Sequence, residues 1–391
     1  MQSIQAALES LKKDHRFRSI PNIDYGADKH VLLQERHILN LASNNYLGFS
    51  ERAEIRRAAV IAAQNYGTTS GASRLVSGTY GPYDALEEEV ARFKGTEAAL
   101  IFNSGYAANL AICSSLADRN CVIFSDRLNH ASIVDGIILS RATHVRYRHN
   151  DMAHLEKCLE KHAGTHRKIV ITDSVFSMDG DMADVAQAAR LCKSHGALLV
   201  LDEAHAAGVL GQGRGLASEL GVADQVDLHM GTFSKAMGSF GAYVAGSRTM
   251  IDWLMNTARS FIYSTSLPPS VIGANREALR IVQNEPQTGK RLMAISKDLR
   301  DALNGMGFDT GQSQTQIIPV ILGDNGATLA ARDFLLQRGL LVGAIRPPTV
   351  PKGTARLRLS LRADLTDREM EEITDTFRDL RQNLPVVGNE S

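Results

Sequence analysis

Seven short apolar runs, separated by segments with helical spacing, occupy the middle of the chain. They cover residues 97–102, 121–124, 144–148, 167–172, 197–202, 226–231 and 241–246. The segment 183–195 illustrates the spacing between them, because Val185, Ala189 and Cys192 fall on one helical face. Strands that alternate with helices form a mostly parallel sheet covered on both faces. The pattern therefore predicts an α/β fold with these runs as its strands.

The segments on both sides of this core mix helical and strand-like patterns. Residues 1–40 predict a helix, with Ile4, Leu8 and Leu11 on one face, and then a short strand-like stretch. Pro268-Pro269 breaks the pattern after the core, and a helix-rich segment follows. The chain then closes with strand-like runs at 315–322 and 355–361 and with a helix at about 367–383, for which Thr366 and Glu369 form a capping box.

These changes of pattern divide the chain into three expected parts. Residues 1–50 form an N-terminal segment, 51–270 a large α/β domain and 271–391 a smaller α+β C-terminal domain. Because ligands often bind where two domains meet, we expect a ligand site in a cleft between the last two.

Composition excludes several classes of function. The chain carries 43 basic and 43 acidic residues in 391, so no overall charge favours nucleic acid or an anionic membrane. Its first residues lack the apolar segment of a signal peptide, and no stretch approaches the length of a membrane span. We therefore expect a cytoplasmic protein. The cysteines are expected to be buried, reduced thiols without zinc-binding spacing, namely Cys113, Cys121, Cys158 and Cys192.

Polar residues follow five of the apolar runs, at the point where each run ends. In order, they are Asn103-Ser104-Gly105, then Ser125-Asp126 with His130, then Asp173 and Ser177, then Asp202, Glu203 and His205, and last Thr232, Ser234 and Lys235. Ligands of open α/β sheets bind beyond the carboxyl ends of the strands. One or two such groups could be ordinary helix caps, but five together favour a binding site.

Two of these residues have a specific chemistry. Asp202 follows an apolar strand, so its carboxylate should be buried and should need a cation, either a protonated pyridine nitrogen or a structural partner. Lys235 lies in a glycine-rich loop between Phe233 and Met237, where partial desolvation would lower the pKa of its amine and let it attack an aldehyde. The spacing alone supports a flexible surface loop equally well.

Other motifs at these positions are weaker. Asp202-Glu203-Ala204-His205 also spells a helicase signature, but Gly289-Lys290 lacks the rest of a phosphate-binding loop, which excludes a nucleotide hydrolase. Asn103-Ser104-Gly105 could present helix amides to a phosphate or could simply cap a helix. His130 and His205 could each be an ordinary histidine, and their spacing gives no support to a metal site.

Two arginines alternate with leucines on the strand-like run at 355–361. Arg356 and Arg358 should therefore face the same side. One guanidinium could bind a carboxylate through two hydrogen bonds, or the pair could be a surface charge ladder.

Several spaced motifs together resemble the α-oxoamine synthases, which join an amino acid to an acyl thioester with loss of carbon dioxide. They are residues 43–48 (SNNYLG), 67–74 (GTTSGASR), 202–208 (DEAHAAG) and 232–235 (TFSK). The resemblance covers nearly the whole chain. It implies a fold-type I transferase that depends on pyridoxal 5′-phosphate, with a mostly parallel seven-stranded sheet in the large domain.

The resemblance implies roles for the matching residues. Lys235 would hold the cofactor as a Schiff base and move the α-proton, and Asp202 would pair with the pyridinium nitrogen. His130 would stack on the ring, and His205 would contact its phenolate side. The other expected cofactor residues are Gly105, Tyr106, Ser177, Thr232, Ser264 and Thr265. The expected substrate contacts are Arg18, His130, Arg346, Thr349 and, for the amino-acid carboxylate, Arg358.

The family also implies a homodimer with the site at its interface, where Ser264 and Thr265 would reach the partner's phosphate. Residues 344–351 and 353–359 look most like the branch that joins L-alanine to a pimeloyl thioester for biotin synthesis. Asp84 and Glu203 depart from residues that are frequent in the family, which blurs the acyl substrate. A glycine-using synthase and a non-catalytic relative remain the alternatives, although Lys235 and Asp202 are intact.

Overall fold

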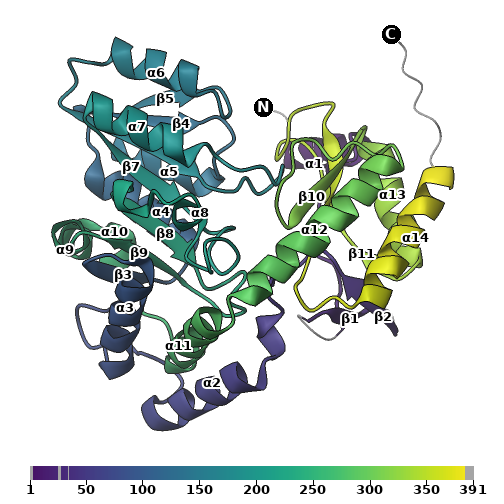
Figure 1. The fold of residues 1–391 in the computed structure, drawn as a ribbon, viewed down its shortest axis with the longest axis horizontal. Coiled ribbons are helices and arrows are strands. Elements are labelled where there is room, and N and C mark those ends of the chain that lie inside the picture. The colour runs from purple at the N-terminus through teal and green to yellow at the C-terminus, as the bar shows by residue number, and fades with distance from the viewer. Residues whose placement is uncertain (1–2, 25–27, 34, 384–391) are drawn as a thin grey trace. The chain divides into compact units, whose positions relative to one another are not determined.

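The computed structural model describes residues 3–24, 28–33 and 35–383, and these form two compact units (Figure 1). The larger unit comprises residues 45–177 and 182–290. The smaller unit comprises the residues up to 44, residues 178–181 and the residues from 291 onward.

A seven-stranded sheet forms the centre of the larger unit and has the strand order β3-β9-β8-β7-β6-β4-β5. Its strands are β3 (Ala98–Phe102), β4 (Cys121–Asp126), β5 (Thr143–Tyr147), β6 (Arg167–Asp173), β7 (Ala197–Asp202), β8 (Leu228–Thr232) and β9 (Ala242–Gly246). Strand β9 runs antiparallel to both of its neighbours, and the pairs from β5 to β8 are parallel. The predicted mostly parallel sheet is therefore confirmed, and each predicted run became a strand.

Helices that precede, connect or follow the strands complete the larger unit. They are α2 (Ala53–Tyr66), α3 (Gly81–Lys94), α4 (Gly105–Leu116), α5 (Ala131–Ser140), α6 (Met152–Lys161), α7 (Val185–His195), α8 (Leu216–Glu219), α9 (Arg248–Thr257), α10 (Arg259–Ile262) and α11 (Pro269–Asn284). A continuous apolar core joins α4 and α5 to the sheet; Leu100, Ile123 and Ile171 in it have no exposed surface. Burial on both faces explains why the central strands are mostly apolar, whereas the edge strand β5 is partly exposed and carries His144 and Arg146.

The smaller unit contains two three-stranded sheets, β1-β2-β11 and β10-β13-β12. Its elements are α1 (Ile4–Lys13), β1 (His30–Leu33), β2 (Arg36–Asn40), β10 (Ile317–Gly323), α13 (Asn325–Gln337), β11 (Leu340–Leu341), β12 (Gly343–Ile345), β13 (Ala355–Ser360) and α14 (Asp367–Asn383). Strand β2 pairs in parallel with β11, so Leu39 lies opposite Leu340. The N-terminal segment is thus an integral part of the smaller unit.

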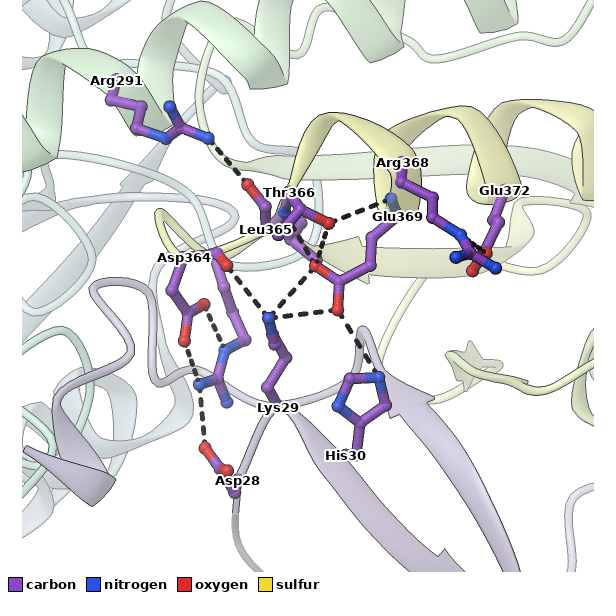
Figure 2. Close-up of polar contacts among 11 residues, drawn as sticks. Asp28, Lys29, His30, Arg291, Asp364, Leu365, Thr366, Arg368, Glu369 and Glu372 are labelled. Carbon is purple, nitrogen blue, oxygen red and sulfur yellow. Dashed lines mark hydrogen bonds and ion pairs between the residues drawn. The ribbon is translucent and has the colours of Figure 1, made fainter.

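The start of α14 is fixed by the expected capping box (Figure 2). The backbone N–H of Thr366 donates to Oε2 of Glu369 at 2.7 Å, and the backbone N–H of Glu369 donates to Oγ1 of Thr366 at 3.2 Å. Lys29 adds an ion pair to the same carboxylate at 3.1 Å. The cap therefore also ties the N-terminal segment to the last helix.

The unit boundary falls later than the domain boundary expected near residue 270. The larger unit continues to Lys290, so it contains α11. Helix α12 (Gln287–Gly305) begins with residues of the larger unit and continues with residues of the smaller one. Within the described ranges, no helix is both long and apolar enough to cross a membrane.

Candidate active site

A cavity of about 220 Å³ lies in the larger unit at the carboxyl ends of the strands. It is lined by Ser104, Gly105, Tyr106, Asn109, His130, Ser132, Asp173, Ser177, Asp202, Ala204, His205, Met230, Thr232, Ser234 and Lys235. All the expected cofactor residues except Ser264 and Thr265 are among them. A larger hollow of about 540 Å³ lies over α2, α3 and α11, but its charged groups Arg276 and Glu89 already pair with each other at 2.5 Å.

Lys235 lies in the tight turn after β8, and its amine faces His205. The distance from its Nζ to Nε2 of His205 is 2.9 Å. Phe233 and Met237 beside it have no exposed surface, so the lysine is half-buried, as its flanking residues predict. Gly238 closes the turn with a φ of 61°, and a Cβ there would lie only 2.5 Å from the backbone N of Ser50. A glycine is therefore required at that position.

Asp202 ends β7 and accepts two hydrogen bonds. Its Oδ1 accepts from the backbone N–H of Ala204 at 2.9 Å, and its Oδ2 accepts from Nδ2 of Asn109 at 2.8 Å. Asp173 is its register partner on β6 and is also buried. Burial, reinforced by the charge of Asp202, raises the pKa of Asp173 well above its ordinary value. Asp202 is the carboxylate of the pair that accepts a side-chain hydrogen bond within the cavity.

His130 is the N-cap residue of α5. Its Nδ1 accepts from the backbone N–H of Ser132 at 3.2 Å and lies 2.7 Å from Oγ of Ser132. The backbone N–H of His130 donates to Oδ2 of Asp173 at 2.7 Å. Contact of the ring with the protein removes water from it and so lowers the pKa of His130. The charge of Lys235 lowers this pKa further, whereas the charge of Asp202 raises it. The exposed imidazole is therefore neutral at pH 7.

His205 is held by a tyrosine that the sequence analysis did not assign. The hydroxyl of Tyr46 lies 2.7 Å from Nδ1 of His205, and Tyr46 has no exposed surface. His205 itself is buried. The imidazole is thus fixed between a tyrosine on one nitrogen and Lys235 on the other.

A buried ionic cluster fixes the turn that begins at Asp202. Oε2 of Glu203 lies 2.5 Å from Nζ of Lys94 and 3.0 Å from Nδ1 of His229. Burial alone would raise the pKa of Glu203, but Lys94 and His229 reverse this effect and hold it at about 2. Glu203 is therefore ionised, and it anchors the residue next to Asp202.

Hydroxyl and amide donors collect on another part of the cavity. Ser104 caps α4 by accepting from the backbone N–H of Ala107 at 3.1 Å, so the first amides of this helix open beside Gly105. Oγ1 of Thr232 lies 2.6 Å from Oγ of Ser234. The N-terminus of a helix with adjacent hydroxyls is suited to an anion such as a phosphate.

Ser264 and Thr265 do not line this cavity within one chain. The carbonyl of Thr265 accepts from Nδ2 of Asn103 at 2.5 Å, and Thr265 forms an isolated bridge with Ser73. The backbone N–H of Ser264 donates to Phe261 at 3.4 Å. Their expected contact with the phosphate of a second subunit stays a prediction.

The expected substrate residues other than His130 belong to the smaller unit. Nη2 of Arg18 donates to Oγ1 of Thr349 at 3.0 Å, and Nη1 of Arg346 donates to the carbonyl of His15 at 2.5 Å. Desolvation, with the nearby charges of Arg332 and Arg18, lowers the pKa of Arg346.

The two arginines of β13 are both buried, so they are no surface charge ladder. Arg356 is paired with Asp179 at 2.5 Å. Arg358 donates to Oγ of Ser360 at 2.8 Å and to Oδ1 of Asn44 at 3.2 Å. Arg356 therefore has a structural ion-pair partner in Asp179, whereas Arg358 donates to a hydroxyl and an amide oxygen.

The described residues contain no cluster of side chains suited to bind a metal ion. Within residues 3–24, 28–33 and 35–383, no three histidine, cysteine or acidic side chains are grouped so as to hold a metal ion. All four cysteines are free; Cys158 is only half-buried, which corrects the expectation that all would be buried.

Comparisons with known proteins identify the family of this chain. The family model for class I and II aminotransferases matches residues 36–377. The chain belongs to this family. The 8-amino-7-oxononanoate synthase of Geobacter sulfurreducens is 49% identical over 98% of this chain and 99% of its own length. A putative 8-amino-7-oxononanoate synthase of Bacillus cereus is 44% identical over 94% of both. The predicted membership of the α-oxoamine synthases is confirmed.

Two solved structures superimpose on most of this chain. Serine palmitoyltransferase of Sphingomonas wittichii superimposes with a TM-score of 0.93 at 33% identity, over 98% of both chains. The 8-amino-7-oxononanoate synthase of Francisella tularensis gives a TM-score of 0.77 at 26% identity, over 88% of this chain and 97% of that one. The fold-type I architecture is therefore confirmed as well.

Sequence analysis missed several residues that line or support the cavity. They are Tyr46, Asn109 and Ser132, with Asp173 noted only as a strand end. One signal could have found Asn109, because it is a lone buried amide in the apolar helix α4. Tyr46 lies in the SNNYLG motif, but no local pattern indicates that it contacts His205.

Proposed function

We propose that this chain condenses L-alanine with a pimeloyl thioester, giving 8-amino-7-oxononanoate, carbon dioxide and a free thiol, as a step of biotin synthesis. The observation that carries the proposal is the pairing of Lys235 and Asp202 in one cavity of a chain with such relatives. Five curated relatives, 47–49% identical over 98–99% of this chain, are named 8-amino-7-oxononanoate synthase. The protein is thus an acyltransferase that depends on pyridoxal 5′-phosphate.

The donor set of the cavity fits this cofactor. Asp202 supplies a buried anion for a protonated ring nitrogen, and Lys235 supplies an amine. The N-terminus of α4 and the hydroxyl of Ser177 supply donors for a phosphate, and Thr232 lines the same cavity while its own hydroxyl donates to the carbonyl of Gly241. When bound, pyridoxal phosphate offers an aldehyde to the lysine and an electron-withdrawing ring to the amino-acid Cα.

Each polar group of the cavity then has a task. Asp202 keeps the ring nitrogen protonated, because its charge is held by two hydrogen bonds and shielded from water. Lys235 removes a proton from Cα of the amino acid and later returns one. His205 orients the amine of Lys235 from 2.9 Å, and His130 covers the ring face.

The smaller unit supplies the proposed substrate contacts. Arg358 is proposed to bind the amino-acid carboxylate, because a guanidinium binds a carboxylate through two parallel hydrogen bonds. Arg18, Arg346 and Thr349 are proposed to contact the acyl substrate. Arg18 and Thr349 already form one hydrogen-bonded pair, which supports a shared role.

A homodimer is the proposed assembly, with Ser264 and Thr265 reaching the phosphate of the other subunit. Large apolar side chains on the surface of the larger unit support an interface. Tyr263 is 72% exposed and Ile138 is 66% exposed, values that association would reduce. Light scattering of the purified protein should give twice the mass of 42.5 kDa.

The test of the reaction is an assay of alanine, glycine and serine against pimeloyl, acetyl and succinyl thioesters. Serine is included because serine palmitoyltransferases superimpose well on this chain. Pimeloyl thioester with L-alanine should give the highest kcat/KM, and the gene should rescue a biotin auxotroph that lacks this step. A higher kcat/KM for glycine with acetyl-CoA would assign the chain to the glycine-using branch. Absence of turnover with every pair would favour a non-catalytic relative.

A further inference from the structure

Four side chains form one hydrogen-bonded series from His130 to Asp202. Nδ1 of His130 lies 2.7 Å from Oγ of Ser132, which lies 2.9 Å from Nδ2 of Asn109. The same Nδ2 is 2.8 Å from Oδ2 of Asp202. Ser132 and Asn109 are buried, at 0% and 1% exposure. They connect a residue proposed to cover the cofactor ring with the one proposed to hold its nitrogen.

The charge of Asp202 sets the direction of every bond in this series. A carboxylate only accepts, so the amide nitrogen of Asn109 and not its oxygen must face Asp202. That nitrogen has two hydrogens, and the second points to Oγ of Ser132. The hydroxyl of Ser132 then has its own hydrogen left for Nδ1 of His130. In this orientation the buried Oδ1 of Asn109 makes no hydrogen bond to the described residues.

Nδ1 of His130 therefore accepts twice. It receives the hydroxyl of Ser132 and the backbone N–H of the same residue, at 2.7 and 3.2 Å. An imidazole nitrogen with two donors directed at it has no room for a proton. The ring proton must lie on Nε2, and protonation of the whole ring requires the Ser132 hydroxyl to turn away.

We propose that Asn109 and Ser132 are positioning residues that keep His130 neutral, with its ring proton on Nε2, for as long as Asp202 is ionised. The inference rests on the roles proposed above for His130 and Asp202. A protonated His130 would be a second cation near Asp202 and would compete with the ring nitrogen for its charge. The series prevents this competition and leaves Nε2–H available as a donor in the cavity.

The other charged groups around His130 do not by themselves keep its ring neutral. Asp202 on β7 and Asp135 on α5 favour the protonated ring, and Lys235 opposes it. Asp173 on β6 accepts from the backbone N–H of His130 and contacts it there. Two carboxylates thus favour protonation, and the donors on Nδ1 act against them together with desolvation of the ring and the charge of Lys235.

The test measures the pKa of His130 in holoenzyme with ¹⁵N-labelled histidine, by long-range ¹H–¹⁵N spectra across pH 5–9. The variants are Ser132→Ala, Asn109→Ala and the double variant, with Ser114→Ala as control. Ser114 also lies on α4, but its hydroxyl only donates to the carbonyl of Leu110. Each single variant should raise the pKa of His130 by roughly half to one unit, and the control should not.

The double variant separates a connected series from two packing defects. Because either substitution interrupts the same series, the double variant should shift the pKa no further than the larger single shift. Unchanged single variants, or shifts that simply add, would overturn the proposal. Ser132→Cys, with a weaker donor of similar shape, should give a smaller shift in the same direction if Ser132→Ala does not fold.

The measurement does not depend on turnover. A shift in His130 without activity toward pimeloyl thioester would contradict the proposed reaction and leave the series intact. Normal activity with an unmoved pKa would contradict the series alone.

Discussion

The hydroxyl of Tyr46 lies 2.7 Å from Nδ1 of His205, on the side of the ring opposite Lys235. Because a tyrosine hydroxyl can donate or accept, it lets His205 exchange its ring proton between the two nitrogens without losing this contact. The charge state of Lys235 can therefore change while the imidazole stays in place.

Tyr46→Phe should fold normally and lower kcat about 5- to 10-fold, because one hydrogen bond of about 1 kcal/mol to His205 is lost. KM for alanine should change little, since Tyr46 is buried behind the histidine. Steady-state kinetics at saturating thioester would measure both constants. A rise in KM with unchanged kcat would contradict a role through His205.

Lys235→Ala should fold and lose turnover, because no other amine lines the cavity among the described residues. Borohydride reduction of the wild-type holoenzyme, followed by peptide mapping, should place the cofactor on Lys235. Lys290→Ala is a matched control outside the cavity and should retain the label and the activity. Label on any lysine other than Lys235 would refute the assignment.

Asp202→Asn should lower kcat by two to three orders of magnitude, or about 3–4 kcal/mol of barrier, because the ring nitrogen loses its anion. The substitution preserves the shape of the side chain. Absorbance spectra of the bound cofactor would confirm loading in the variant. Near-normal turnover would show that the ring nitrogen does not need this charge.

Lys94→Met should lower the free energy of unfolding by about 3–5 kcal/mol, because it removes the lysine from the buried carboxylate of Glu203 and leaves His229 as its ion-pair partner. The double variant Lys94→Met/Glu203→Gln should recover part of this loss. Urea midpoints at pH 7 would measure both. Lys161→Met, on the C-terminal turn of α6, is a control that should leave the midpoint unchanged.

The same cluster sets a pH dependence with a definite sign. The folded-state pKa of Glu203, about 2, lies below its ordinary value of 4.5, so acid protonates the unfolded chain first. Its stabilising contribution is complete above about pH 4.5 and is lost between 4.5 and 2. The urea midpoint of Lys94→Met/Glu203→Gln should therefore change less with pH below 4.5 than the midpoint of the wild type. An equal change with pH in both proteins would be evidence against an ionised Glu203.

The strands were predictable because burial on both faces leaves a local mark in the sequence. ALLVLD became β7, and Asp202 followed at its carboxyl end as expected. The capping box of Thr366 and Glu369 was predictable for the same reason, since both of its partners lie within three residues.

The supports of the site were not predictable because their partners are distant in sequence. Tyr46 contacts a residue 159 positions away, and Asn109 contacts Asp202 across 93 positions. Arg356 and Arg358 looked equivalent on alternating positions, but Asp179 pairs with only the first. Local periodicity gives the face of an element, whereas the partner on that face depends on the topology.

The parallel pairing of β2 with β11 has a consequence for synthesis on the ribosome. Leu39 and Leu340 are roughly 300 residues apart along the chain, so β2 emerges long before its neighbour exists. At common elongation rates the delay is about 15–60 s. The larger unit, whose residues lie between these two strands in the sequence, can fold during that time. The N-terminal strand meanwhile presents an unpaired edge to chaperones or to other nascent chains, so slower translation should increase aggregation of this protein more than that of a variant lacking β2.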